Sequence, residues 1–321
     1  MGLTLVITGA SGFIGRACVS AALRRGHKVR ALVRRESAFF PNGVEVLPCD
    51  LADDITTLRS ALIGADAVIH AAAAMSGDAK ITQRDTIAVS SNLFAALAHQ
   101  APGARLVLVS SVAVYAAAAG DITEHTPLEP APQTRDGYAR AKLAQEALLA
   151  GTSLQGWIAR PGAVFGPGRL WNAHLGLRLG PVFLRLGGAA PIPLIGLDPC
   201  AEALVRAAET PPPGGGMRPV NLVESDLPSA RRYLRALGAA APRLQLPLPW
   251  RLFAAAGRAL ETIPALRGSL PGLLQPQTLR ARFAARTWSN ARAEAELGWV
   301  SRQPFENALH AAVAASDGAP A

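Results

Sequence analysis

The sequence predicts an α/β protein with a doubly wound parallel sheet, joined to a smaller and mainly helical C-terminal part. Short apolar runs alternate with helical patterns through the first half of the chain, as is typical of strand–helix–strand units. The chain has 321 residues, half of them hydrophobic, which is enough to bury a large core. We therefore expect one domain at residues 1–166, completed by about 194–223, and a second at 167–193 and 224–321.

The first expected strand enters a glycine-rich turn that leads into a helix. Residues 3–15 read Leu-Thr-Leu-Val-Ile-Thr-Gly-Ala-Ser-Gly-Phe-Ile-Gly, and a helical pattern continues over 16–25. Gly9 permits the tight turn, Gly12 lets a diphosphate approach the backbone, and Gly15 lets the helix pack against its strand. The amides and the positive dipole end of the helix would face the diphosphate of a dinucleotide. The contacts predicted here are Thr8, Gly9, Ser11, Gly12, Phe13, Ile14 and Gly15.

The net charge of +9 raises the question of nucleic-acid binding, which basic proteins achieve through phosphate contacts. The arginines are spread along the chain, without a basic run and without interleaved aromatic residues. We therefore expect no nucleic-acid partner. A bias in the base composition of the genome explains the charge, part of which serves an anionic cofactor.

The cysteines indicate neither a disulfide framework nor a metal site. Cys18, Cys49 and Cys200 are too few and too scattered for either, so we expect buried thiols and no metal. Gly, Pro or Arg interrupts the apolar stretches well before the length that spans a bilayer, and the N-terminus begins with a strand instead of a basic leader. These features predict a cytoplasmic protein without an integral membrane segment.

The second expected strand, residues 28–33, ends in Arg34 and Arg35. A dinucleotide fold that binds NAD has an acidic residue here, which binds the ribose 2′-hydroxyl. A carboxylate would repel a 2′-phosphate, whereas a guanidinium pairs with it through two hydrogen bonds. The pattern favours NADP(H) over NAD(H). The alternative is that both arginines are merely solvated.

A buried strand is expected at 67–70, followed by residues with small side chains that let a cofactor approach the backbone closely. His70 ends this strand and has no evident partner in the sequence, so we expect a structural role for it. The cofactor contacts predicted after this strand are Ala71, Ala72 and Ala73.

A serine and a Tyr-x-x-x-Lys spacing suggest proton-transfer chemistry. The strand expected at 105–109 leads to Ser111, at the edge where a doubly wound sheet binds its ligand. A helix expected over 138–149 begins with Tyr138 and places Lys142 on the same face. A nearby cation and a hydroxyl partner lower the pKa of a tyrosine, which suits proton relay to a carbonyl. The alternative is a packed tyrosine beside an exposed lysine.

Together these motifs resemble the extended short-chain dehydrogenase/reductase family over nearly the whole chain. The resemblance also rests on Asp50-Leu51, Ser110-Ser111-Val-Ala-Val-Tyr and Arg160-Pro-Gly-Ala-Val-Phe-Gly-Pro-Gly. It implies a Rossmann fold in which Ser111 orients and polarises the substrate carbonyl and Tyr138 donates or accepts the proton. It also implies that Lys142 holds the nicotinamide ribose and lowers the tyrosine pKa. The further cofactor contacts that it implies are Asp50 beside the adenine, Leu51, Pro161 beside the nicotinamide, and Ala163.

The sequence departs from the family pattern at two positions. The helix expected over 86–99 keeps the second family asparagine as Asn92 but has Thr86 in place of the first. This change puts in doubt a helix-bending, water-binding contact behind the active site. Nucleotide-sugar members have an asparagine where this chain has Ala163, and that asparagine contacts the sugar diphosphate. Its loss favours the branch similar to dihydroflavonol reductases and 3β-hydroxysteroid dehydrogenases.

The C-terminal part is expected to cover the substrate. Residues 171–193 should close over it, 211–216 form a surface connector, and 229–315 form a helical cap. Within the cap, the apolar stretch 244–276 is ordinary core, the wall of an apolar pocket, or a membrane or partner surface. A rim loop without regular structure is expected at 116–133.

Two functional hypotheses follow. The first is an NADP(H)-dependent oxidoreductase that interconverts a ketone or aldehyde and a secondary alcohol on a hydrophobic small molecule, with Tyr138 handling the proton. Within the enzyme class, the alternative is a nucleotide-sugar epimerase or dehydratase that retains its nicotinamide cofactor. The second hypothesis is a non-catalytic NADP-binding module, since fold alone does not determine function. The presence of both Tyr138 and Lys142 favours an enzyme. The sequence leaves open whether the protein forms a homodimer.

Overall fold

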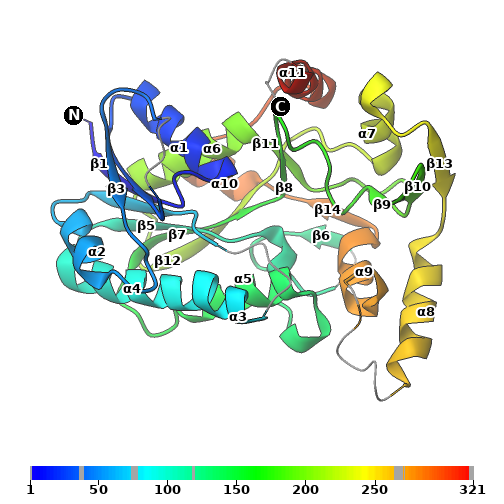
Figure 1. The fold of residues 1–321 in the computed structure, drawn as a ribbon, viewed down its shortest axis with the longest axis horizontal. Coiled ribbons are helices and arrows are strands. Elements are labelled where there is room, and N and C mark those ends of the chain that lie inside the picture. The colour runs from blue at the N-terminus through cyan, green and yellow to red at the C-terminus, as the bar shows by residue number, and fades with distance from the viewer. Residues whose placement is uncertain are drawn as a thin grey trace.

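The computed structural model describes residues 2–35, 40–73, 79–117, 120–263, 270 and 272–317. These residues form a central sheet of seven parallel strands in the order β12-β7-β5-β4-β1-β2-β3 (Figure 1). The strands are β1 (Thr4–Thr8), β2 (Lys28–Val33), β3 (Val44–Pro48), β4 (Ala67–His70), β5 (Arg105–Val109), β7 (Gln155–Pro161) and β12 (Met217–Leu222). The strand order reverses between β1 and β4, and a doubly wound sheet binds its ligand beyond the carboxyl ends of such a pair. The predicted fold class is confirmed.

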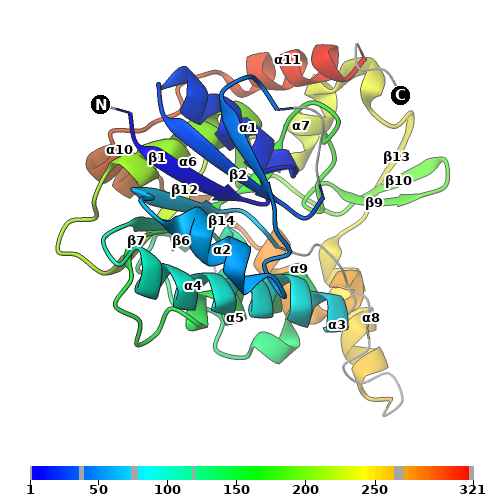
Figure 2. The same cartoon turned by 60° about the vertical axis from the view of Figure 1, so that its left-hand side comes forward.

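Helices cover both faces of this sheet (Figure 2). One face carries α1 (Phe13–Arg24), α6 (Leu197–Glu209) and α10 (Ala291–Leu297), and the other carries α2 (Ile55–Leu62), α4 (Val89–Gln100) and α5 (Gly137–Ala147). Along β1, Leu5 and Ile7 pack on the α1–α6 side, whereas Val6 packs on the α2–α4 side. Because both faces are buried, the strands read as uninterrupted apolar runs in the sequence.

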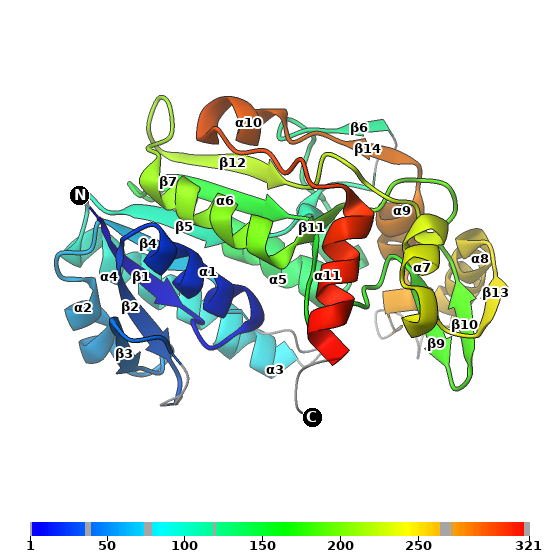
Figure 3. The ribbon, with the colours of Figure 1, turned by 90° about the horizontal axis from the view of Figure 1, so that it is seen from above.

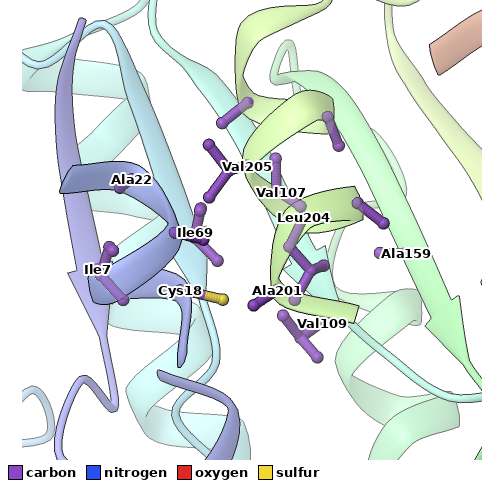
Figure 4. Close-up of a cluster of buried hydrophobic side chains, with 14 of the residues drawn as sticks. Ile7, Cys18, Ala22, Ile69, Val107, Val109, Ala159, Ala201, Leu204 and Val205 are labelled. Carbon is purple, nitrogen blue, oxygen red and sulfur yellow. The ribbon is translucent and has the colours of Figure 1, made fainter. Parts of the chain in front are cut away.

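Small side chains allow α1 and α6 to pack closely on the sheet (Figure 4). Cys18 of α1 and Ala201 of α6 are fully buried in one cluster with Ile69 and Val107 of the sheet. Burial of one large aliphatic side chain contributes roughly 1.5–3 kcal/mol, so this layer is a main source of stability. All three cysteines are free and buried, as predicted.

Among the described residues, three smaller sheets lie beyond the carboxyl ends of the central strands (Figure 3). They pair β8 (Ala163–Phe165) with β11 (Leu194–Gly196), β6 (Gly120–Ile122) with β14 (Arg286–Trp288), and β10 (Val182–Arg185) with both β9 (Gly176–Leu179) and β13 (Leu244–Pro247). The helices here are α7 (Ala230–Ala236), α8 (Trp250–Glu261), α9 (Pro276–Phe283) and α11 (Phe305–Asp317). The expected rim loop at 116–133 is wrong over β6, which forms because β14 supplies its backbone partners. The division of the chain into two domains stays a prediction.

The helix expected over 86–99 begins earlier and is irregular. It starts as α3 (Ala79–Thr82), continues as a π-helix (Gln83–Ala88), and then becomes α4. The wide π turn is present although Thr86 replaces the family asparagine. Such turns occur frequently at functional sites, and this one packs against α5, the helix that contains Tyr138 and Lys142.

The stretch 244–276 is core only in part where the structure describes it. Ala254 of α8 belongs to a buried cluster, against which Leu248, Trp250 and Phe253 pack. All four residues of β13 are exposed, and so is Leu252 of α8. Residues 264–269 and 271 lie outside the described part of the chain.

Gly15 allows α1 to lie against the glycine turn. A Cβ atom on Gly15 would lie 2.1 Å from the carbonyl oxygen of Gly9 and 2.8 Å from Cα of Ala10. Alanine normally stabilises a helix interior relative to glycine, by roughly 0.5–1 kcal/mol. Here we expect Gly15→Ala to lower the free energy of unfolding by about 1–3 kcal/mol instead, because the backbone must shift.

Urea unfolding of the two proteins measures this difference. Gly103→Ala is the matched control, because nothing lies within 4 Å of the added Cβ atom there. We expect that control to keep the wild-type midpoint. A Gly15→Ala protein with an unchanged midpoint would contradict the proposed close contact.

Candidate functional site

The glycine turn after β1 forms the floor of the candidate site. Gly9 has a φ of +63°, and a Cβ atom there would lie 2.8 Å from the backbone of Ala72, so only glycine fits without strain. Gly12 is the N-cap of α1, and no side chain of the described residues caps this helix. Its first-turn amides therefore suit an anionic ligand, with the positive end of the helix dipole behind them.

A cavity of about 190 Å³ follows the carboxyl ends of β1 to β4. The predicted cofactor residues that line it are Gly9, Ser11, Gly12, Arg34, Asp50, Leu51, Ala71, Ala72 and Ala73. The sequence did not single out the other lining residues, which are Leu32, Val33, Cys49, Asp85 and Val89. An uncapped helix N-terminus, small residues and a carboxylate at a strand end together fit a dinucleotide.

Arg34 lies at this cavity, where a carboxylate holds it. Its Nη1 atom is 2.8 Å from Oδ2 of Asp85, and 64% of the arginine side chain is exposed. Arg84 binds Asp85 at 2.9 Å and Asp50 at 2.6 Å. Charges of both signs are therefore present beside the residues expected at the adenosine ribose. Arg35 is exposed and does not line the cavity.

Ser111 and Tyr138 come together beyond the end of β5. The Oγ atom of Ser111 accepts a hydrogen bond from the amide of Ala113 at 3.1 Å. Tyr138 lies in the first turn of α5, which Asp136 caps by accepting a hydrogen bond from the amide of Ala139 at 2.9 Å. The hydroxyl groups of Ser111 and Tyr138 lie near enough for Ser111 to act on the pKa of Tyr138.

The surroundings act on the pKa of Tyr138 in two directions. Burial raises this pKa above its usual value, and the negative charge of Asp136 adds to the rise. The hydroxyl of Ser111 and the positive charge of Arg169 act to lower it. On balance the pKa of Tyr138 is raised, so the phenol keeps its proton at neutral pH.

Lys142 places its ammonium group at the end of the same strand. Its Nζ atom donates to the carbonyl oxygen of Val109 at 2.6 Å and to Oε1 of Gln145 at 2.9 Å. Burial lowers the pKa of Lys142 to about 8, although the charge of Glu146 acts in the opposite direction. The end of β5 and the helix α5 thus gather the three residues predicted as a set.

A chain of buried polar groups runs from Lys142 back toward the glycine turn. Nε2 of Gln145 donates to Oγ of Ser90 at 2.8 Å, and Oγ of Ser90 lies 3.0 Å from Nε2 of His70. Nδ1 of His70 lies 2.7 Å from Oγ1 of Thr8. Burial, together with the charge of Lys142, lowers the pKa of His70 to about 3, so the imidazole is neutral. Both ring nitrogens of His70 thus have buried partners, Thr8 and Ser90, and its structural role stays a prediction.

A second buried network lies beneath the catalytic set. The carboxylate of Glu146 accepts hydrogen bonds from Nε and Nη2 of Arg160 at 3.0 and 2.7 Å, and one from the Ser110 hydroxyl. Nη1 of Arg160 donates to the Tyr115 hydroxyl at 3.0 Å, and that hydroxyl donates to Asn221. The network ties α5 to β5, β7 and β12, the elements that position Ser111 and the catalytic helix.

The other predicted cofactor residues do not line the cavity. The ring of Phe13, in the first turn of α1, lies under the guanidinium of Arg169, with 4.9 Å between the guanidinium carbon and the ring centre. Pro161 ends β7, and Ala163 begins β8. The remaining residues of this group are Thr8, Ile14 and Gly15.

The model of the NAD dependent epimerase/dehydratase family matches residues 5–186, which include every predicted site residue. The chain belongs to this family. Within it, the 3-diazoavenalumate denitrifying reductase of a Streptomyces species is 29% identical over 323 residues, covering 94% of this chain and 97% of that protein. The ceramide reductase of Caulobacter vibrioides is 32% identical over 218 residues, covering 64% of this chain and 61% of that protein.

Solved structures show the same fold for this family member. The structure of MoeE5 in complex with UDP-glucose and NAD superposes with a TM-score of 0.72 at 20% identity, covering 98% of each chain. In the present chain, Gln145 accepts a hydrogen bond from Lys142 and donates one to Ser90, and Ser90 donates to the carbonyl oxygen of Thr86 in the π turn. The sequence did not single out Gln145 or Ser90.

Proposed function

We propose that the protein is an NADP(H)-dependent oxidoreductase that interconverts a ketone or aldehyde and a secondary alcohol. The observation that carries the proposal is that Ser111, Tyr138 and the buried ammonium group of Lys142 come together at the end of β5. This set lies at the same sheet edge as the cavity formed by the glycine turn. Membership of a nicotinamide-dependent family and relatives named reductases support it.

The chain's own groups would handle the proton and the charge, while the bound cofactor supplies or accepts a hydride. Tyr138 gives its proton to the carbonyl oxygen as the alcohol forms, and takes it back in the reverse direction. Ser111 donates a hydrogen bond to the same oxygen, where negative charge develops. Lys142 stabilises the phenolate across a low-dielectric site and holds the nicotinamide ribose.

The substrate would be a hydrophobic small molecule. Ala163 has no polar group to offer a sugar diphosphate, and one relative is named a ceramide reductase. Residues 1–166 with 194–223 would hold the cofactor, and 167–193 with 224–321 would hold the substrate. The exposed leucines of β13 and α8 lie within residues 224–321, in the part of the chain that would hold the substrate.

A screen of NADPH oxidation against aryl, alicyclic and long-chain ketones tests the proposal. We expect steady turnover with apolar ketones and free exchange of the cofactor. A nicotinamide released only on denaturation, together with turnover of nucleotide sugars, would indicate an epimerase or dehydratase. NADP binding without turnover of either class would indicate a non-catalytic module.

Arg34 is expected to make NADP(H) bind about tenfold or more tightly than NAD(H), since charge-assisted hydrogen bonds contribute roughly 1.5–3 kcal/mol. Arg34→Ala should abolish this preference, and calorimetric titration of both cofactors measures it.

Asp85→Asn should increase the preference for NADP(H) about two- to fivefold, because Arg34 no longer gives up an ion pair of roughly 0.2–1 kcal/mol to reach the phosphate. Arg59→Ala, an exposed arginine of α2, is the matched control. Equal affinities of the wild-type protein for NADP(H) and NAD(H) would contradict the proposed role of Arg34.

A further inference from the structure

The sheet β9-β10-β13 has one face made entirely of aliphatic side chains. Its register aligns Leu179, Val182 and Leu244 in one row and Leu177, Leu184 and Leu246 in the next. Leu179, Leu244 and Leu246 are 52%, 56% and 49% exposed. Figure 2 shows the β9–β10 hairpin projecting from the body of the molecule. Leu184, in the middle of the second row, is buried. We call the other five residues of the two rows, Leu177, Leu179, Val182, Leu244 and Leu246, the leucine face; none of these five belongs to a buried cluster of the described residues.

The opposite face of this sheet packs on α7 and encloses a basic cavity. The cavity has a volume of about 310 Å³ and is lined by Arg185, Arg231, Leu234, Arg235, Gln245 and Pro247. Its three arginines make no ion pair with any described residue, and the nearby carboxylates of Asp226 and Glu306 both bind Arg232. A guanidinium cluster without carboxylates favours a phosphate-bearing ligand.

Two more exposed arginines belong to this sheet or directly precede one of its strands. The register pairs Arg178 with Phe183, so its side chain lies on the face opposite the leucines, and Arg243 directly precedes β13. Neither forms an ion pair within the described part of the chain. An apolar face with cations on the other side of the same sheet matches a membrane interface, where acyl chains lie below a layer of phosphates.

The helix α8 continues this amphipathic character along the same edge of the molecule, directly after β13 (Figure 1). Leu252 is 60% exposed, and Ala255, Ala256 and Ala259 follow it on the exposed side of the helix. Arg251 flanks this stripe. No described helix is long and apolar enough to cross a bilayer, so a contact with lipid here would be confined to its surface.

We propose that this end of the molecule docks on a bilayer containing anionic phospholipids, with the leucine face at the acyl boundary and the arginines on headgroup phosphates. The proposed partner is a lipid surface. Two observations favour it, and neither depends on the reaction that the protein catalyses: the leucine face, and the cavity lined by arginines without a carboxylate. The inference goes beyond the proposed function, because its test measures vesicle binding and needs no substrate.

Co-sedimentation of the full chain with vesicles tests the proposal. We expect binding to vesicles of phosphatidylcholine with phosphatidylglycerol, weaker binding to phosphatidylcholine alone, and a decrease as salt is raised. Leu179→Ser/Leu244→Ser should reduce binding roughly tenfold through the apolar contact, and Arg231→Ala/Arg235→Ala should do so through charge. Ile63→Ser is the matched control, because Ile63 is 62% exposed at the end of α2, away from this sheet.

Circular dichroism of each variant shows whether it is folded, and light scattering reports its mass. Equal binding to both vesicle types, or variants that bind like the wild type, would overturn the proposal. A wild-type dimer that the leucine variant converts to a monomer, with no lipid binding by either, would assign the face to a second copy of the chain instead.

Discussion

Replacing Tyr138 by phenylalanine is expected to lower turnover by roughly 10²–10⁴, the effect of a positioned acid–base group. The substitution keeps the ring and removes only the hydroxyl that meets Ser111. The free energy of unfolding and the cofactor affinity should therefore change little. Steady-state kinetics on an identified substrate, with cofactor titration at the same pH, measures both.

Three further variants distinguish a catalytic hydroxyl from a structural one. Tyr233→Phe is the matched control, since the Tyr233 hydroxyl binds the carbonyl oxygen of Leu170 at 2.6 Å, away from the catalytic set, and should affect stability alone. Ser111→Ala should mainly lower turnover. Lys142→Met should lower both turnover and cofactor affinity, because the lysine has two proposed roles. Near-native turnover of Tyr138→Phe would show that another group donates the proton.

Local sequence patterns predicted several strands of the central sheet, although not β7. The strands expected at 28–33, 67–70 and 105–109 coincide with β2, β4 and β5. Their apolar runs end abruptly at polar or small residues, because burial on both faces stops where the sheet meets the ligand edge. Gly9 was evident from the glycine-rich motif that follows the first strand. The structure gives the physical reason for this glycine, because a positive φ and contact with Ala72 leave no room for a side chain.

Contacts between distant segments were not predictable in this way. Asp85 meets Arg34 because a π turn in a different helix brings it there, and neither residue signals the other. Gln145 and Ser90 are polar residues in helical patterns, for which exposure is the ordinary expectation. Both are fully buried because each satisfies the other beneath Lys142.

The stretch 244–276 shows a related limit. Its hydrophobicity predicts contact with something apolar but does not say whether the same chain supplies it. The register of β13 answers the question for Leu244 and Leu246, which lie on the uncovered side of a small sheet. The sequence left three alternatives open for this stretch, and for the part that contains Leu244 and Leu246 we propose the last of them, a membrane or partner surface.

The buried pair of Glu146 and Arg160 is expected to have the largest effect on stability. Each side chain is only 5% exposed. Burial acts to lower the pKa of Arg160, but its hydrogen bonds and charge interaction with Glu146 outweigh this and keep the pKa above its usual value. Glu146→Leu would leave the guanidinium buried without its carboxylate, so the free energy of unfolding should fall by about 3–5 kcal/mol.

A double variant separates the pair from the cost of one unpaired charge. Glu146→Leu/Arg160→Met removes both charges and should be more stable than Glu146→Leu alone, because apolar side chains of similar volume replace a buried ion pair at little net cost. Glu294→Leu is the control: its contact with Arg302 is 3.7 Å long and well exposed, so the change should stay within about 0.5 kcal/mol. Urea unfolding of the wild type and of the three variants gives the four free energies of unfolding. If the double variant is no more stable than Glu146→Leu, the carboxylate acts mainly through Ser110, and the coupling between α5 and β7 is not what holds the catalytic helix in place.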